Sequence, residues 1–213
     1  TLPATGSEMN NGGVITHRAK GAKLAFSSVH TYPLFSVQDR FAEGILHTLI
    51  EVGPRLLAAP EPVYDDRANL VWAATTALNG FVGAGVPQDW ATHMIGHELT
   101  ATFHIDHART LAVVLPALLN ERRAAKREKL LQYGQRIWGI SSGTEDERID
   151  AAIERTRDFF ERMGIATRLS AYGVGADAID GLVAQLQAHG MTRLGEQREI
   201  TPEVSRRILQ AAL

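Results

Sequence analysis

The chain has 213 residues, of which 45% are hydrophobic and 22% charged, a balance typical of a globular protein with a buried core. A formal net charge of -2 and a pI near 6.4 give no electrostatic basis for binding nucleic acid or an anionic membrane, so neither partner is expected. The absence of cysteine excludes disulfides, thiolate metal ligands and a cysteine nucleophile. With no apolar run of about eighteen residues and no signal-peptide pattern, the expected location is the cytoplasm.

The first 37 residues differ in pattern from the rest of the chain. Glycines separate short apolar runs at residues 14–16, 24–26 and 34–37, which predict strands or a hairpin with turns near residues 10–13 and 20–22. A β segment of this length cannot bury a core by itself. We therefore expect it to pack against the rest of the chain or a partner, and its open strand edges favour a homodimer.

From residue 38 onward, apolar residues recur at helical spacing. Two stripes, at residues 41–52 and 70–78, predict helices, with a break at Gly53-Pro54 after the first. Residues 111–119 are apolar on nearly all sides, which predicts a central helix with a kink at Pro116. The charged run at residues 120–129 is expected to be solvated surface.

The C-terminal third carries clear helix boundaries. Thr144 and Glu147 have the spacing of a capping box that opens a helix ending at Gly164. Residues 177–189 predict another helix, and Thr201-Pro202 begins the last one. We therefore expect a mainly α fold with a short N-terminal β appendage.

Four of the eight histidines lie between residues 93 and 107. On a helix, His93 and His97 share a face, and His104 returns to the same stripe. An unbroken helix would separate His93 from His107 by about 21 Å, far beyond the bonds of about 2 Å to a shared metal. A break between residues 100 and 106 would bring the two together. The sequence thus permits a helix-loop-helix metal clamp.

The sequence also bears on other interpretations of these histidines. Asp106 is a good N-cap for a second helix, which favours the break. A zincin requires HExxH, but His97-Glu98 is followed by Leu99-Thr100-Ala101, so that motif is excluded. Histidines that cap helices and satisfy buried polar groups are an equal alternative to a metal site.

Three separated stretches resemble the group III, or iron-containing, alcohol dehydrogenases. They are TLPATGSEMN at residue 1, the run from ALNG at 77 to LPAL at 118, and GMTRLGEQREIT at 190. Within the family, the chain resembles most the NADP-dependent aldehyde reductase branch, the YqhD-like butanol dehydrogenases. Members have an α/β nucleotide-binding domain and a C-terminal all-helical domain, with the active site in the cleft between. The resemblance implies that residues 1–37 are a β remnant of the first domain and residues 38–213 the all-helical metal-binding domain.

The resemblance also implies roles for single residues. His93 and His107 match two of the four metal ligands of the family, and His97 matches a histidine that lines the substrate pocket. The implied cofactors are a divalent metal, zinc or iron, and NADP(H). The residues that match the nicotinamide-cofactor segment and a basic position near the ribose and phosphate are Thr1, Thr5, Gly6, Ser7 and Lys23. A simple turn at Thr5-Gly6-Ser7 and a solvated strand position at Lys23 are the alternatives.

Some family features have no match in this sequence. The other two metal ligands, an aspartate and a histidine in an Asp-Ala-x-x-His segment, are absent. The chain passes directly from residues 33–37 to residues 38–41, as if some tens of residues were missing. The Gly-Gly-Gly-Ser phosphate loop, which would precede Thr1, is also absent. Half of the metal ligands and most of the cofactor site therefore have no counterpart.

The resemblance implies an oxidoreductase that reduces an aldehyde to a primary alcohol with NADPH and a metal. Because the chain lacks half of the metal ligands, we expect it to be incomplete and inactive alone. The alternative is a truncated, non-catalytic helical domain that acts as a folding or dimerisation unit.

Overall fold

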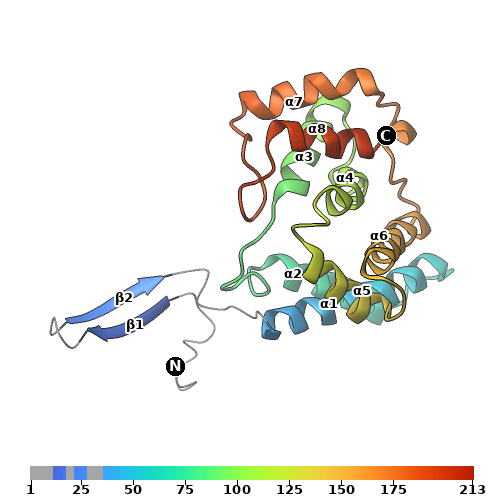
Figure 1. Cartoon of the computed structure of the whole chain (residues 1–213). Helices are drawn as coiled ribbons and strands as arrows, with labels where there is room; N and C mark the ends of the chain where they lie inside the picture. Colours follow the sequence, from blue (N-terminus) through green and yellow to red (C-terminus); the bar gives the residue numbers. More distant parts are fainter. Residues whose placement is uncertain (1–11, 18–21, 28–35) are drawn as a thin grey trace. The chain divides into compact units, whose positions relative to one another are not determined.

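The computed structural model describes residues 12–17, 22–27 and 36–213 (Figure 1). The chain forms two compact units, Thr1–Gln88 and Asp89–Leu213. The expected division into a β remnant of the nucleotide-binding domain at residues 1–37 and an all-helical domain at residues 38–213 stays a prediction. The described elements are β1 (Gly12–His17), β2 (Ala22–Ser27), α1 (Ser36–Ala58), α2 (Tyr64–Leu78), α3 (Ala91–Phe103), α4 (His107–Glu121), α5 (Arg127–Trp138), α6 (Glu145–Arg162), the 3-10 helices η4 (Leu169–Tyr172) and η5 (Ala176–Ala178), α7 (Ile179–Ala188) and α8 (Pro202–Ala211).

The first unit contains the predicted β hairpin. Strands β1 and β2 pair antiparallel, with Gly12 opposite Ser27 and His17 opposite Ala22. The prediction of a further strand at residues 34–37 is wrong for residues 36 and 37, because these two residues begin α1. Its first two residues lie outside the described part of the chain.

Helices α1 and α2 pack together in this unit. Gln38 at the start of α1 donates hydrogen bonds from Nε2 to the carbonyls of Phe81 (2.9 Å) and Ala84 (3.1 Å), beyond the end of α2. The break expected at Gly53-Pro54 is wrong, because α1 continues to Ala58. A proline removes one helical hydrogen bond, and here it does so only in the last turns. Arg55, directly after it, pairs with Asp66 of α2 at 2.6 Å, which supports the continued helix.

The second unit is built around α4. Its side chains Val113, Val114, Ala117 and Leu118 are at most 3% exposed and belong to the same buried cluster as residues of α3, α7 and α8. Figure 1 shows α7 and α8 side by side, with α3 and α4 next to them. The expectation that residues 111–119 form a central helix is confirmed, and the helix runs on through Pro116.

Helices α5 and α6 form a second layer with its own apolar cluster of Leu130, Ile149 and Ile153. The predicted capping box is confirmed, since Thr144 Oγ1 accepts from the Glu147 amide and Glu147 accepts from the Thr144 amide at 2.8 Å. The fold is mainly α, as the sequence predicted. No helix in the described part is both long and apolar enough to cross a membrane.

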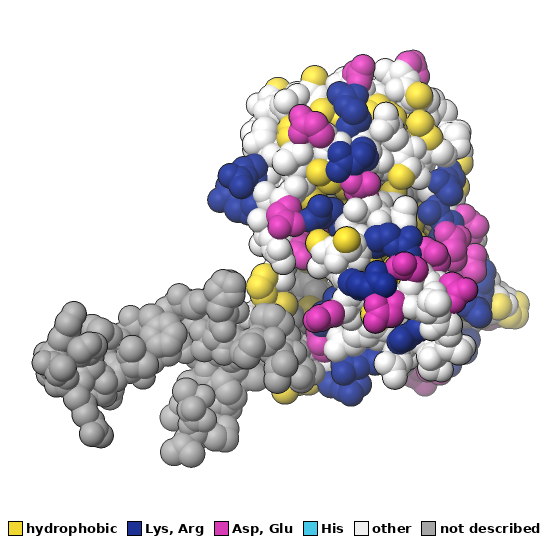
Figure 2. Space-filling view, viewed as in Figure 1, with side chains coloured by type: hydrophobic (Ala, Val, Ile, Leu, Met, Phe, Trp, Pro, Cys, Tyr) yellow, Lys and Arg dark blue, Asp and Glu magenta, His cyan; other side chains and the backbone are white. Residues whose placement is uncertain are grey.

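The surface of the described residues carries both signs of charge. On the face shown in Figure 2, basic and acidic side chains lie next to one another. Arg127, for example, contacts Glu145 at 2.6 Å and Asp146 at 2.7 Å. Exposed pairs of this kind add little stability each, about 0–1 kcal/mol.

Candidate metal-binding site

The four central histidines lie at the junction of α3 and α4. Helix α3 ends at Phe103, and α4 begins at His107. Between them His104 takes a left-handed conformation with φ 56° and ψ 28°, and its amide donates to the Thr100 carbonyl at 3.0 Å. The predicted break is therefore confirmed. His104 itself leaves the helical stripe on which an unbroken helix would have placed it.

This turn gathers three imidazole rings. The ring centroids of His93 and His107 are 5.3 Å apart, and those of His97 and His107 are 4.9 Å apart. His93 and His97, one turn apart on α3, are separated by 6.4 Å. The reversal at residues 104–106 thus replaces a separation of about 21 Å along a straight helix with near contact.

The spacing of His93 and His107 suits two ligands of one metal ion. Two imidazoles bound to tetrahedral zinc at about 2.0–2.1 Å have ring centroids about 5 Å apart, close to the observed 5.3 Å. Within residues 12–17, 22–27 and 36–213, no group of three or more His, Asp or Glu side chains is arranged to hold a metal ion. The donors therefore fit part of a metal site and not a complete one.

A glycine allows the two helices to approach at this point. A Cβ atom built on Gly96 of α3 would lie 2.8 Å from Oγ1 of Thr110 on α4. Thr110 is fully buried, and its hydroxyl donates to the His107 carbonyl at 2.8 Å. Any side chain at position 96 would thus press directly on the first turn of α4. The close crossing keeps His107 near the face of α3 that carries His93.

The three histidines differ in exposure. His97 and His107 are exposed, whereas His93 is half-buried with its ring 4.8 Å from that of Trp90. Partial burial lowers the pKa of His93 below its usual value, and the positive charges that His107 and His97 could carry lower it further. A lowered pKa favours the neutral imidazole of His93, which is the form that binds metals.

Two contacts that anchor α3 left no signal in the sequence pattern. Oε1 of Glu98, a buried residue next to His97, lies at hydrogen-bond distance, 2.7 Å, from Nδ1 of His189 at the end of α7. Just before the start of α3, Oδ1 of Asp89 accepts from the Ala91 amide at 2.8 Å, while Oδ2 lies 2.9 Å from Nζ of Lys126. The Glu98–His189 and Asp89–Lys126 contacts join residues far apart in the chain, so periodicity and local motifs cannot predict them.

The expected roles of the cofactor residues are not tested by the structure. Thr1, Thr5, Gly6 and Ser7 lie outside the described residues. Lys23 lies in β2, in register with Thr16 of β1. Their proposed roles therefore rest on the resemblance alone.

Comparison with known families decides the relationship of the chain. The family model of the C-terminal part of Fe-containing alcohol dehydrogenases matches residues 23–213. The chain belongs to the iron-containing alcohol dehydrogenase family. Among its relatives is the NADPH-dependent aldehyde reductase YqhD of Escherichia coli K12, at 53% identity over all of this chain and 64% of the relative. NADH-dependent butanol dehydrogenase A of Clostridium acetobutylicum is 29% identical over 95% of this chain and 62% of the relative.

Solved structures of this family agree with the fold. The crystal structure of E. coli YqhD superposes with a TM-score of 0.82, covering the whole of this chain and 64% of that one. NADH-dependent butanol dehydrogenase A of Thermotoga maritima gives a TM-score of 0.76 at 25% identity, with the same coverage of both chains. The helical fold is thus the C-terminal helical domain of this family. The chain spans less than two thirds of the length of these relatives.

The alignment with YqhD also contains positions that this chain lacks. It extends over 250 positions, whereas the whole chain has 213 residues, so about 37 positions have no residue here. A difference of this size agrees with the expectation that some tens of residues of the family are missing from this chain.

Proposed function

We propose that this chain is the helical, metal-binding part of an NADP-dependent alcohol dehydrogenase or aldehyde reductase, with His93 and His107 as two of its metal ligands. The observation that carries the proposal is the reversal at His104, which sets these two rings 5.3 Å apart. Zinc and iron both accept imidazole ligands, so the donor atoms favour neither metal.

The reaction would be hydride transfer from NADPH to an aldehyde, giving a primary alcohol. When bound, the metal would supply Lewis-acid polarisation of the substrate carbonyl. His97, exposed and 4.9 Å from His107 between ring centroids, is suited to orient the substrate or deliver a proton. By resemblance, the residues proposed to contact NADP(H) are Thr1, Thr5, Gly6, Ser7 and Lys23.

We expect these 213 residues alone to bind metal weakly and not to reduce aldehydes. Two imidazoles supply half of a tetrahedral shell, and the carboxylate that would offset the metal charge has no match. Hydride transfer depends on a fixed nicotinamide, for which the family uses a phosphate loop that also has no match. Both expectations follow from the missing matches and are independent of each other.

The test combines binding and turnover. Calorimetric titration with zinc and iron(II) should give weak binding that is abolished in His93→Ala and in His107→Ala. His47→Ala, a histidine of α1 outside the cluster, is the matched control and should bind as the unmodified chain does. NADPH oxidation with butyraldehyde should not exceed the background. Tight metal binding that survives His93→Ala would show that the proposed ligands are not the ones that bind the metal. Metal-dependent turnover by protein of verified 23.2 kDa mass would refute the expectation that the chain alone is inactive.

A second candidate is a non-catalytic folding or dimerisation unit, acting as a homodimer in the cytoplasm. One observation favours it: helix α2 exposes Val71 (64%), Trp72 (70%) and Leu78 (73%), an apolar surface that a second copy of the chain could cover. Sedimentation equilibrium distinguishes the two candidates when combined with NADPH titration. A dimer with no NADPH affinity supports this candidate, and a monomer that binds NADPH excludes it.

A further inference from the structure

The motif GMTRLGEQREIT at residues 190–201 has no role in the metal site described above. In the structure it forms a closed loop, because Leu194 and Ile200 exchange backbone hydrogen bonds of 2.9 and 3.0 Å. Both of these side chains are buried, so the base of the loop is fixed in the core. Gly195 makes the turn possible with a φ of +85°, a conformation that other residues rarely adopt. The acidic residues between them face the neighbouring connection from α4 to α5.

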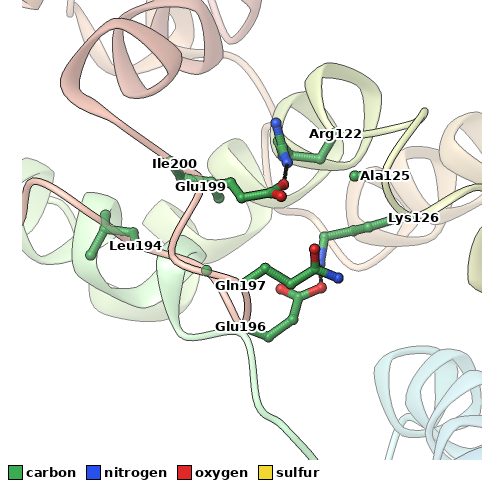
Figure 3. Close-up of a pocket in the computed structure, with 9 residues that line it drawn as sticks. Arg122, Ala125, Lys126, Leu194, Glu196, Gln197, Glu199 and Ile200 are labelled. Carbon is green, nitrogen blue, oxygen red and sulfur yellow. Dashed lines mark hydrogen bonds and ion pairs between the residues drawn. The ribbon is translucent and has the colours of Figure 1, made fainter.

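Two basic side chains of that connection hold the loop (Figure 3). Arg122, at the end of α4, pairs with Glu199, and Nζ of Lys126, at the start of α5, lies 2.6 Å from Oε1 of Glu196. The Lys126 side chain is only 16% exposed. Burial alone would lower the pKa of Lys126, but its contacts with Glu196 and Asp89 outweigh burial and raise it. The ammonium therefore stays charged between its partners.

Lys126 also reaches the start of the histidine helix. Its Nζ lies 2.9 Å from Oδ2 of Asp89, and the other oxygen of that carboxylate accepts from the amide of Ala91, the first residue of α3. Free amides at a helix start are stabilised by such an acceptor. His93 follows two residues later, in the same turn. Lys126 thus joins the first turn of α3 to the 194–200 loop.

We propose that Lys126 is a positioning residue for the metal site, which fixes the first turn of α3 and so holds the ring of His93 against that of His107. Without the ammonium, the carboxylates of Asp89 and Glu196 would face each other and repel. The carboxylate of Asp89 would then no longer be held in position to accept the hydrogen bond from the Ala91 amide. The inference rests on the proposed function only where it calls the ring cluster a metal site.

The experiment measures the ring cluster directly, without requiring metal. Lys126→Met removes the charge, Lys126→Arg restores it, and Lys129→Met is the matched control, since Lys129 contacts Gln132 on the surface of the same helix. NMR would record the nuclear Overhauser effect between the His93 and His107 rings and the exchange rate of the Met94 amide, which donates to the Trp90 carbonyl.

In Lys126→Met we expect the ring-to-ring effect to weaken and the Met94 amide to exchange about five- to tenfold faster, the effect of losing a cap. Lys126→Arg should recover most of both signals, and Lys129→Met should change neither. Asp89→Ala removes the acceptor of the Ala91 amide together with the partner of Lys126, so it should act like Lys126→Met and serves if that variant does not fold. Ring contact and amide exchange that stay unchanged in a folded Lys126→Met or Asp89→Ala protein would overturn the proposal.

Cobalt(II) titration of the same variants separates this inference from the proposed function. Groups that orient metal ligands typically change metal affinity by about 10–100-fold, so Lys126→Met should weaken binding by about tenfold. If the unmodified chain binds no cobalt, the metal function fails, while the NMR signals still decide the role of Lys126. If cobalt binds and Lys126→Met binds it equally well, the positioning role is wrong.

Discussion

Replacing Gly96 by alanine should loosen the crossing of α3 and α4 on which the histidine cluster depends. The added Cβ would lie 2.8 Å from Oγ1 and 3.4 Å from Cβ of Thr110, and 3.5 Å from Cδ2 of Leu111. Thr110 has no exposed surface, and its hydroxyl donates a hydrogen bond to the His107 carbonyl of the same helix, so its side chain cannot move aside without disturbing α4. Overpacking of this kind costs about 1–3 kcal/mol. The better helix propensity of alanine returns up to about 1 kcal/mol, which leaves a net loss of up to about 2 kcal/mol.

A matched substitution isolates the packing cost. Gly181 lies in α7, is exposed, and has no atom within 4 Å of the position of an added Cβ. Gly181→Ala should therefore stabilise the protein by about 0.5–1 kcal/mol. Urea unfolding of the two variants gives the comparison, and their difference in unfolding free energy should be about 1–3 kcal/mol. If Gly96→Ala is as stable as Gly181→Ala, the helices are not in tight contact at this point and the reasoning fails.

Three further predictions concern the core, alkaline pH and association. Val114→Asp should abolish cooperative folding, because Val114 is 0% exposed and an unpaired buried carboxylate is severely destabilising. Leu115 is only half-buried, so Leu115→Asp should destabilise the protein less, and equal thermal melts of the two variants would contradict this. Burial raises the pKa of Tyr133 above its usual value of about 10, so the stability it contributes is complete below pH 10 and is lost as the pH rises through the folded-state pKa. The free energy of unfolding, measured from pH 8 to 11, should therefore fall more steeply in the unmodified chain than in Tyr133→Phe. Parallel pH profiles for the two proteins would refute this prediction. The two-stranded β1–β2 hairpin should pair with a second copy through its edges, which light scattering would detect as a dimer; a monomer at high concentration with this segment protected in hydrogen exchange would count against it.

The sequence predicted the helical domain and the reversal between α3 and α4 because both depend on local signals. The apolar spacing, the capping box at Thr144 and the N-cap residue Asp106 are each signals that depend on a few neighbouring residues. The prediction of a break at Gly53-Pro54 failed for a reason outside that range. Arg55 beside the proline is anchored to Asp66 of the next helix, and tertiary contacts outweigh local propensity there.

The supports of the candidate site could not be predicted from local patterns. Residues 120–129 were expected to be solvated surface, yet Lys126 among them is largely buried between Asp89 and Glu196. Glu98 and His189 are likewise joined only in the folded chain. Each of these pairs joins segments separated by tens of residues, and a charged residue that finds a distant partner looks the same in sequence as one that faces water. The ligand histidines could be proposed from spacing, but the contacts that hold them could not.

The central claim is that His93 and His107 together supply two ligands to one metal ion. Zinc K-edge X-ray absorption on the zinc-loaded chain tests it most directly, because it counts the imidazoles bound to the metal. We predict two imidazoles with the remaining positions filled by oxygen, and a hydrated zinc ion without bound imidazole in His93→Ala and in His107→Ala. Three imidazoles would make His97 a ligand rather than a substrate-facing residue, and a zinc shell unchanged by His93→Ala would contradict the account.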